Sequence, residues 1–136
     1  MTLVQAVGKG DKMDAIVRDA TELGATRVVP VVAERSVVRA EDVASRAARW
    51  RRIAIEAARQ CGRGDAPRVD APVVLGEALA GLPVETGLGV CLVPGAAPGL
   101  GDALRGLAAG ASVTIVVGPE GGCRRGRSRR VRRGGW

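Results

Sequence analysis

Short runs of apolar and β-branched residues alternate with longer stretches of helical periodicity along most of this chain. The strand-like runs occupy residues 3–7, 27–32, 88–93 and 113–117, and helical segments separate most of them. Parallel neighbouring strands need a long crossover, usually a helix, whereas antiparallel strands can be joined by two residues. The alternation therefore predicts an α/β fold, with a mainly parallel sheet and helices on both of its faces.

Two long helices are expected from the spacing of apolar residues. The first begins at Asp11, an N-cap residue type, and ends before Gly24, and its apolar residues recur every three or four positions. The second runs from Glu41 to Cys61 and ends at a Gly-Arg-Gly sequence. Trp50 is on its apolar side, so we predict that Trp50 packs on the sheet and does not stack on an RNA base. Two shorter helices are expected at residues 76–82 and 100–109.

Pro30 lies inside the strand predicted at residues 27–32. Proline has no backbone N–H to donate, so an interior strand is disrupted by it. We therefore expect this strand to be short or to end near Pro30. A weak strand region is expected around Val69, Val73 and Val74, between two further prolines.

The charge is distributed unevenly between the body of the chain and its last fourteen residues. Residues 1–122 hold 14 Lys and Arg against 14 Asp and Glu, so the net charge of +7 comes from seven arginines in residues 123–136. Runs of like charge without an apolar period are usually disordered. We therefore expect one domain at residues 1–122 and an Arg/Gly-rich tail at 123–136 that is disordered or read from a shifted frame.

The cysteines suggest neither a metal site nor a disulfide framework. The chain has Cys61, Cys91 and Cys123, an odd set without C-x-x-C spacing, and it has no histidine. We expect buried, reduced thiols. No run of 18 apolar residues and no charged-then-apolar leader is present, which predicts a soluble cytoplasmic protein without membrane contact.

Two glycine-rich loops follow the last two predicted strands. One spans residues 94–99 and the other residues 118–122, where Glu120 places a carboxylate among the glycines. Ligands of open α/β sheets bind outside the carboxyl ends of the strands, and glycines let a backbone approach a ligand closely. Neither loop has the spacing of a dinucleotide fingerprint or a P-loop. On spacing alone, plain turns without a ligand remain an alternative.

Several blocks of sequence occur in a characteristic order across residues 2–122. They are Lys9 to Asp14, Ala20 to Ala25, Val29 to Pro30 followed by Glu34 to Ser36, Arg49 to Ala54, Glu56 to Arg63, and Val117 to Gly122. In this order they resemble the RsmE family of 16S ribosomal RNA uracil-N3 methyltransferases, which belong to the SPOUT class.

The resemblance implies an α/β sheet whose C-terminal part is threaded as a trefoil knot. It also implies S-adenosylmethionine as cofactor, a homodimer, and ribosomal RNA or the small ribosomal subunit as partner. No metal is implied, and the catalytic residue is unknown. The cofactor contacts are expected at Gly118, Pro119, Glu120, Gly121, Gly122, Pro94 and Gly95. The RNA contacts are expected at Arg35, Arg49, Arg52 and Arg63.

The sequence departs from the family pattern at both ends. The family's N-terminal β-barrel does not precede the first strand, and the segment that completes the knot does not follow Gly122. We expect the knot to be incomplete and S-adenosylmethionine to bind weakly or not at all, because a cofactor site needs most of its surface enclosed. A non-catalytic truncated product, or a small basic RNA-associated protein, remains the alternative.

Overall fold

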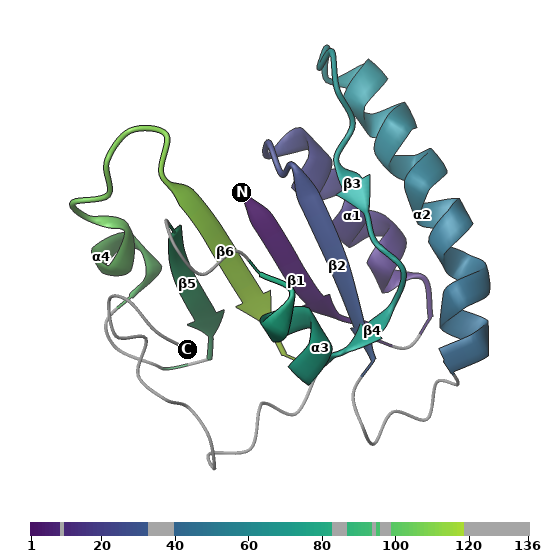
Figure 1. Ribbon diagram of the computed structural model, residues 1–136. Coiled ribbons are helices and arrows are strands. Elements are labelled where there is room, and N and C mark those ends of the chain that lie inside the picture. The colour runs from purple at the N-terminus through teal and green to yellow at the C-terminus, as the bar shows by residue number, and fades with distance from the viewer. Residues whose placement is uncertain (9, 33–39, 83–86, 94, 96–98, 119–136) are drawn as a thin grey trace.

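The computed structural model of the chain describes residues 1–136 except 9, 33–39, 83–86, 94, 96–98 and 119–136 (Figure 1). The strands are β1 (Thr2–Ala6), β2 (Arg27–Val32), β3 (Arg68–Val69), β4 (Val73–Val74), β5 (Gly87–Leu92) and β6 (Ser112–Val117). The helices of the described ranges are α1 (Lys12–Glu22), α2 (Ala40–Gln60), α3 (Leu75–Ala80) and α4 (Leu100–Leu104). This alternation confirms the predicted α/β class.

The strands form one sheet in the order β3-β2-β1-β6-β5. β4 pairs with the end of β2, on the same side as β3, which pairs with its start. Every pairing is parallel, so the arrowheads of β1, β2, β5 and β6 all point to the lower edge of the sheet in Figure 1. The first strand therefore lies beside β6, the strand farthest from it in the described sequence. The loops that follow β1, β2, β5 and β6 all leave the sheet from this carboxyl edge.

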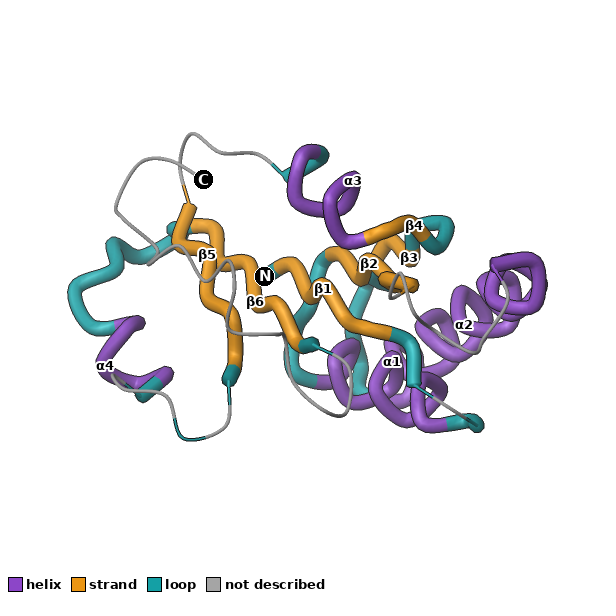
Figure 2. Tube along the Cα trace, turned by 90° about the horizontal axis from the view of Figure 1, so that it is seen from below, coloured by secondary structure: helices purple, strands orange, loops and turns teal. Residues whose placement is uncertain are grey.

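Helices cover both faces of the sheet, as the sequence predicts. Viewed along the sheet, α1 and α2 lie on one side and α3 lies on the other (Figure 2). Two hydrophobic clusters fill the spaces between these layers. The first joins α1 and α2 to the sheet through Val7, Met13, Val17, Ala20, Ala25, Val28, Ala47, Trp50, Ala54 and Val69. The second, under α3, contains Val4, Val29, Val31, Ala78, Leu82 and Val116.

Trp50 is the largest fully buried side chain of the described residues, with 0% of its surface exposed. It belongs to the cluster between α2, α1 and the sheet. The predicted packing of Trp50 on the sheet is therefore confirmed. The helical spacing of apolar residues in α2 identified the buried side of the helix correctly.

The prediction that the second strand ends near Pro30 is wrong. The strand continues to Val32, and Pro30 is fully buried between β1 and the β3–β4 side. The carbonyl of Val28 accepts a hydrogen bond from the amide of Asp70, the residue after β3. Residues two positions apart in a strand direct their backbone groups to the same side, so the nitrogen of Pro30, which carries no hydrogen, also faces the β3–β4 side. The partner strand is interrupted there between β3 and β4, so the missing donor breaks no ladder bond.

Both long helices end at a glycine in the left-handed region, as predicted. Gly24 has φ +88° and follows α1, and the amide of Ala25 donates to the carbonyl of Ala20 at 2.9 Å. Gly62 has φ +74° and ends α2 in the same way. A side chain at either position would be strained, so these glycines fix where the helices stop.

The fourth helix is shorter than predicted. It ends at Leu104, not at residue 109, because Arg105 is extended with ψ 132° and Gly106 follows with φ +80°. A single extended residue interrupts the i to i+4 hydrogen-bond ladder. The apolar residues after Leu104 therefore do not continue the helix.

The expectation of buried thiols is also wrong for the two cysteines that the structure describes. Cys61 and Cys91 are both exposed. Cys61 lies just beyond the end of α2, and Cys91 lies on β5, at the outer end of the strand order. An outer strand has a neighbour on one side only, so its side chains are covered less completely. Cys123 lies outside the described residues.

Candidate functional site at the carboxyl edge of the sheet

The two glycine-rich loops predicted from the sequence leave the sheet side by side. β5 and β6 are paired in register to their last residues, where Leu92 is the partner of Val117. Val93 and Gly118, the next residues of each chain segment, therefore start their loops at the same place on the carboxyl edge (Figure 1). Segments that are 25 positions apart in sequence thus meet where ligands of open α/β sheets bind.

A third loop reaches the same edge from the start of the chain. β1 pairs with β6, with Gln5 as the partner of Val117, and the turn from β1 to α1 follows immediately. Gly8 of this turn has open space where a side chain would stand, and Gly10 has φ +71°. This turn was not among the site loops predicted from the sequence. Its glycines after a predicted strand could have indicated a ligand-binding turn. That the turn lies beside the loop after β6 follows only from the pairing of β1 with β6, which local sequence does not reveal.

The described part of this edge combines backbone groups with apolar surface. Gly95 has φ +72°, and a side chain added there would meet no atom within 4 Å. Leu92 and Val93 are 38% and 44% exposed. Open glycine turns present amide and carbonyl groups to a ligand, while exposed aliphatic side chains suit an apolar ring. This edge can therefore contact both polar and apolar parts of a ligand.

The described residues place Gly118 and Gly95 of the predicted cofactor set at this edge. The other predicted cofactor residues lie outside the described residues, as does one of the predicted RNA contacts. These are Pro94, Pro119, Glu120, Gly121, Gly122 and Arg35.

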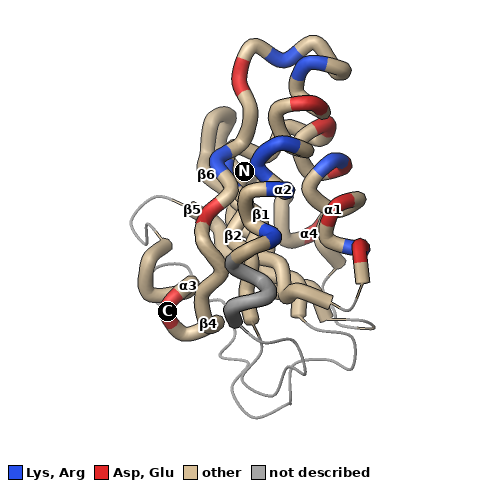
Figure 3. Tube along the Cα trace, turned by 90° about the vertical axis from the view of Figure 1, so that its right-hand side faces the viewer, with Lys and Arg blue, Asp and Glu red and all other residues tan. Residues whose placement is uncertain are grey.

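The predicted RNA-contact arginines on α2 differ in their surroundings. Arg52 is exposed. Arg49 is 54% exposed, and its Nη2 pairs with Oδ2 of the buried Asp14 at 2.5 Å. Figure 3 shows Lys and Arg interspersed with Asp and Glu on this side of the molecule. The phosphate-binding capacity of this face therefore depends on which guanidinium groups are not already paired.

Arg63 joins the ends of the two long helices. Its Nη1 donates to the carbonyls of Thr21 at 2.7 Å and Ala25 at 2.9 Å, and Nη2 lies 3.3 Å from Asp65. Only 18% of its side chain is exposed. Arg49 lies about three helical turns before the end of α2, and Arg63 follows that end. The structure therefore gives Arg63 a stabilising contact and does not bring it together with Arg49 and Arg52.

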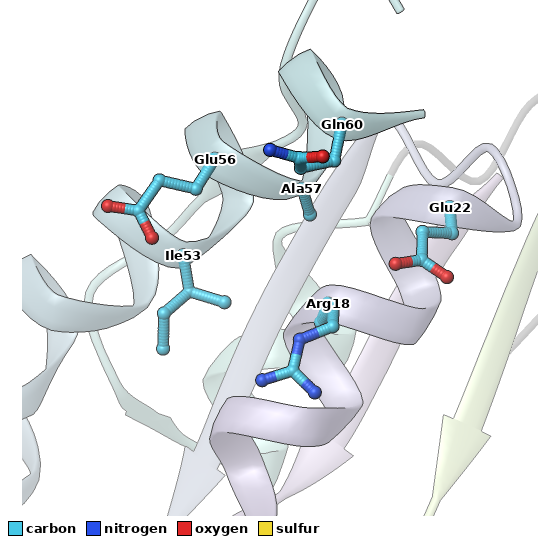
Figure 4. A pocket seen from close by; sticks show the side chains of 6 residues that line it. All are labelled: Arg18, Glu22, Ile53, Glu56, Ala57 and Gln60. Carbon is cyan, nitrogen blue, oxygen red and sulfur yellow. The ribbon is translucent and has the colours of Figure 1, made fainter. Parts of the chain in front are cut away.

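A shallow groove of about 320 Å³ lies away from the carboxyl edge, between α1 and α2. Figure 4 shows that its side chains come from the second halves of both helices. Because crossover helices run antiparallel to the strands, this region lies toward the amino ends of the strands. The lining residues are Arg18, Glu22, Ile53, Glu56, Ala57 and Gln60.

Within the ranges that the structure describes, no three histidine, cysteine or acidic side chains are grouped so that they could hold a metal ion. The helices of those ranges include none with the length and apolar character that a membrane span requires.

Comparison with known proteins gives consistent matches. The sequence profile of the RNA methyltransferase domain family matches residues 1–133. The ribosomal RNA small subunit methyltransferase E of Synechocystis is 37% identical over 125 residues, covering 90% of this chain and 40% of the relative. The protein of the same name from Bacillus subtilis is 42% identical over 69 residues, covering 49% of this chain and 27% of the relative. The chain thus spans less than half the length of these curated relatives.

Solved structures share the fold. The ribosomal RNA small subunit methyltransferase E of Neisseria gonorrhoeae, bound to S-adenosyl methionine, is 38% identical with a TM-score of 0.76. The match covers 89% of this chain and 49% of that one. Lpg2936 of Legionella pneumophila, a methyltransferase structure with bound SAM, is 29% identical with a TM-score of 0.73 and the same coverage.

Proposed function

The chain belongs to the family of RNA methyltransferase domains, and from this premise we propose that it takes part in S-adenosylmethionine-dependent methylation of ribosomal RNA. Its curated relatives carry the name ribosomal RNA small subunit methyltransferase E, so the resemblance to the RsmE family is confirmed. The target in this proposal is N3 of a uracil in 16S ribosomal RNA. The protein acts on the small ribosomal subunit, as a homodimer in the cytoplasm.

The pairing of Leu92 with Val117 is the observation that carries this proposal. It brings the loop after β5 and the loop after β6 to one place, so that both can contact a single ligand. The turn after β1 adds a third segment beside them. The cofactor-binding residues of the proposal are Gly118, Pro119, Glu120, Gly121, Gly122, Pro94 and Gly95.

The chain's contribution to the reaction is positioning. S-adenosylmethionine, when bound, supplies an electrophilic methyl group on a sulfonium centre. Backbone groups of Gly95 and Gly118 would hold and orient the cofactor, and Leu92 and Val93 would exclude water from the faces of its adenine ring. Holding two reactants in line converts a bimolecular step into an effectively unimolecular one, which contributes about 7–11 kcal/mol at best.

The RNA is held by arginines of the α2 side in this proposal. Arg35, Arg49, Arg52 and Arg63 supply charge to phosphates, which fixes the position of the RNA without reading its sequence. Arg49 and Arg52 are both exposed on α2, but Arg49 pairs with Asp14, and Arg63 donates to carbonyls within the protein. We therefore assign Arg52 the larger share of phosphate contact.

The test combines cofactor binding with product analysis. The chain is titrated with S-adenosylmethionine in a calorimeter, and it is incubated with the cofactor and small subunits that lack the modification. Nucleosides from the digested 16S RNA are then separated by mass spectrometry. Because the sequence predicts an incomplete knot, the proposal expects weak but saturable heat, together with 3-methyluridine, and it is contradicted if both are absent.

A pair of glycine variants tests where the cofactor binds. Gly8→Val adds a branched side chain to open space at the carboxyl edge, at a position without positive φ. Gly101→Val makes the same change in open space on α4 and serves as the control. The cofactor affinity should fall about tenfold or more for Gly8→Val, which corresponds to about 1.4 kcal/mol. Equal affinities of the two variants would exclude the edge around Gly8.

A further inference from the structure

The geometry points to Arg46 as a positioning residue that fixes the β1–α1 turn at the carboxyl edge of the sheet. The described residues of this turn are Val7, Gly8, Gly10 and Asp11. The inference rests on the proposed function, because it assigns that turn to the wall of the methyl-transfer site. It concerns a side chain that neither binds the cofactor nor touches the reacting atoms.

One guanidinium group makes three different contacts. Nη2 of Arg46 donates to the carbonyl oxygen of Gly10 and lies 3.5 Å from Oδ1 of Asp11. Its central carbon lies 5.6 Å from the centroid of the Trp50 ring. The Arg46 side chain is 24% exposed and the Asp11 side chain is 77% exposed, so the ion pair faces water while the rest of the guanidinium is partly shielded. An arginine from α2 thereby holds the backbone and a side chain of a turn that precedes α1.

The start of α1 has no capping contact of its own from Asp11. Asp11 occupies the N-cap position, but its side chain makes no capping hydrogen bond. Its carboxylate pairs with Arg46 instead. The usual local restraint on the first turn of a helix is therefore replaced by a contact from another helix.

Arg46 lies over the ring of Trp50, and contacts to α1 hold that ring in place. Trp50 is completely buried, and its Nε1–H donates to Oδ1 of Asp14 at 3.1 Å. Arg49 pairs with the other oxygen of Asp14 at 2.5 Å. Arg46, Arg49 and Trp50 are at positions i, i+3 and i+4 of α2, so they share one side of it. Together they bind the turn and the first turn of α1 to one rigid face.

Arginine suits this position for a reason that lysine does not share. A planar guanidinium can donate in its plane to a carbonyl and a carboxylate while its face lies on an indole ring. An ammonium group keeps the charge but cannot make the in-plane and face contacts together. Arg46→Lys should therefore loosen the turn while leaving the charge and the fold in place.

Ordering of the β1–α1 turn by Arg46 affects the site because β1 lies directly beside β6. The turn after β1 stands next to the loop that begins at Gly118, on the edge where the cofactor and the uracil are proposed to meet. A displacement of about 1 Å in such a wall can cost about 100-fold in rate. Ordering of the turn by Arg46 thus contributes to the preorganisation of the site.

The experiment compares the wild-type chain with Arg46→Lys, and with Arg46→Gln as a second variant that removes the charge. Arg59→Lys, an exposed arginine in the last turn of α2, is the matched control. Amide hydrogen exchange is followed in peptides that span the turn and the start of α1. Thermal unfolding of each variant is measured in parallel to detect any global loss of stability.

Arg46→Lys should increase amide exchange at Asp14, whose N–H donates to the Asp11 carbonyl of the turn at 3.0 Å, by about tenfold or more, with unchanged exchange in β6. The affinity for S-adenosylmethionine or the rate of uracil methylation should fall together with it, while Arg59→Lys resembles the wild type. Unchanged exchange in the turn overturns the inference, whether or not the wild type binds the cofactor. Faster exchange with wild-type affinity and rate also overturns it.

A wild-type chain that neither binds S-adenosylmethionine nor methylates RNA contradicts the proposed function and the assigned role in the site. The exchange comparison still decides whether Arg46 orders the turn. The two failures are therefore distinguished by separate measurements on the same protein.

Discussion

The indole nitrogen of Trp50 donates a hydrogen bond to the Asp14 carboxylate at 3.1 Å, and both side chains are buried between α1 and α2. The bond joins the middle of α2 to the first turn of α1. A buried carboxylate needs polar partners, and Asp14 receives this hydrogen bond together with the charge of Arg49. The polar pair therefore sets how α1 and α2 meet within an otherwise apolar layer.

Trp50→Phe should destabilise the fold by about 2–4 kcal/mol, because it removes the indole donor and leaves part of a buried volume empty. Urea unfolding measures this loss. Ile55→Val on the exposed side of the same helix is the control, and it should stay within about 0.5 kcal/mol of the wild type. A loss of less than about 1 kcal/mol for Trp50→Phe would show that the bond to Asp14 contributes little.

The start of the β5–β6 pair depends on a residue without a side chain at position 87. A Cβ built on Gly87 would lie 2.4 Å from Oγ and 2.8 Å from the backbone oxygen of Ser112. Gly87→Ala should therefore cost about 1–3 kcal/mol by forcing the strands apart. Gly76→Ala, with open space in α3, should leave stability unchanged or raise it slightly.

The Gly87 clash can be separated into its two parts by a second substitution. Ser112→Ala removes the Oγ atom but keeps the backbone oxygen. The double variant should thus recover only part of the stability lost in Gly87→Ala, as measured by thermal unfolding. Complete recovery would locate the whole conflict in the hydroxyl group, which can rotate away.

Arg63→Ala should destabilise the chain by about 1–3 kcal/mol. It removes the donor for the carbonyls of Thr21 and Ala25 at the end of α1. Arg59→Ala removes the same charge from an exposed position in the last turn of α2 and should change stability by less than about 0.5 kcal/mol. Equal effects in urea unfolding would mean that the loss comes from charge and not from these hydrogen bonds.

The layers of this fold could be predicted from the sequence because they follow from local periodicity. The apolar spacing around Trp50 identified the buried side of α2, and Gly24 and Gly62 identified the helix ends. The predicted loops after β5 and β6 do begin at one edge, because parallel strands place their carboxyl ends together. These inferences need only the residues within each segment.

The strand order and the contacts between helices could not be predicted in this way. That β1 lies beside β6 is a pairing of distant segments, so the turn at Gly8 was not assigned to the site. Pro30 was misjudged because its tolerance depends on a break in the neighbouring strand. The contacts of Arg63 could not be predicted, because the carbonyls that it binds, those of Thr21 in α1 and Ala25 after it, lie about 40 positions away in sequence.

The last prediction concerns RNA affinity and its dependence on salt. Each phosphate contact made by a Lys or Arg side chain releases condensed counterions, so its loss lowers the slope of log K against log salt by about 0.7–0.9. Arg52 is exposed on α2, and the proposed function assigns it a phosphate contact. Arg52→Gln should therefore weaken binding to a 16S RNA fragment at every salt concentration and lower that slope by about one contact.

Arg105→Gln supplies the matched control, because Arg105 is 82% exposed on the α4 side and loses the same charge. Its slope should equal that of the wild type. Arg49→Gln should affect the slope less than Arg52→Gln, since its guanidinium already pairs with Asp14, but it should lower the free energy of unfolding by leaving that carboxylate buried without its partner. Equal slopes for Arg52→Gln and Arg105→Gln would show that the RNA is held by diffuse charge, and the α2 surface would then not be the RNA-contact face.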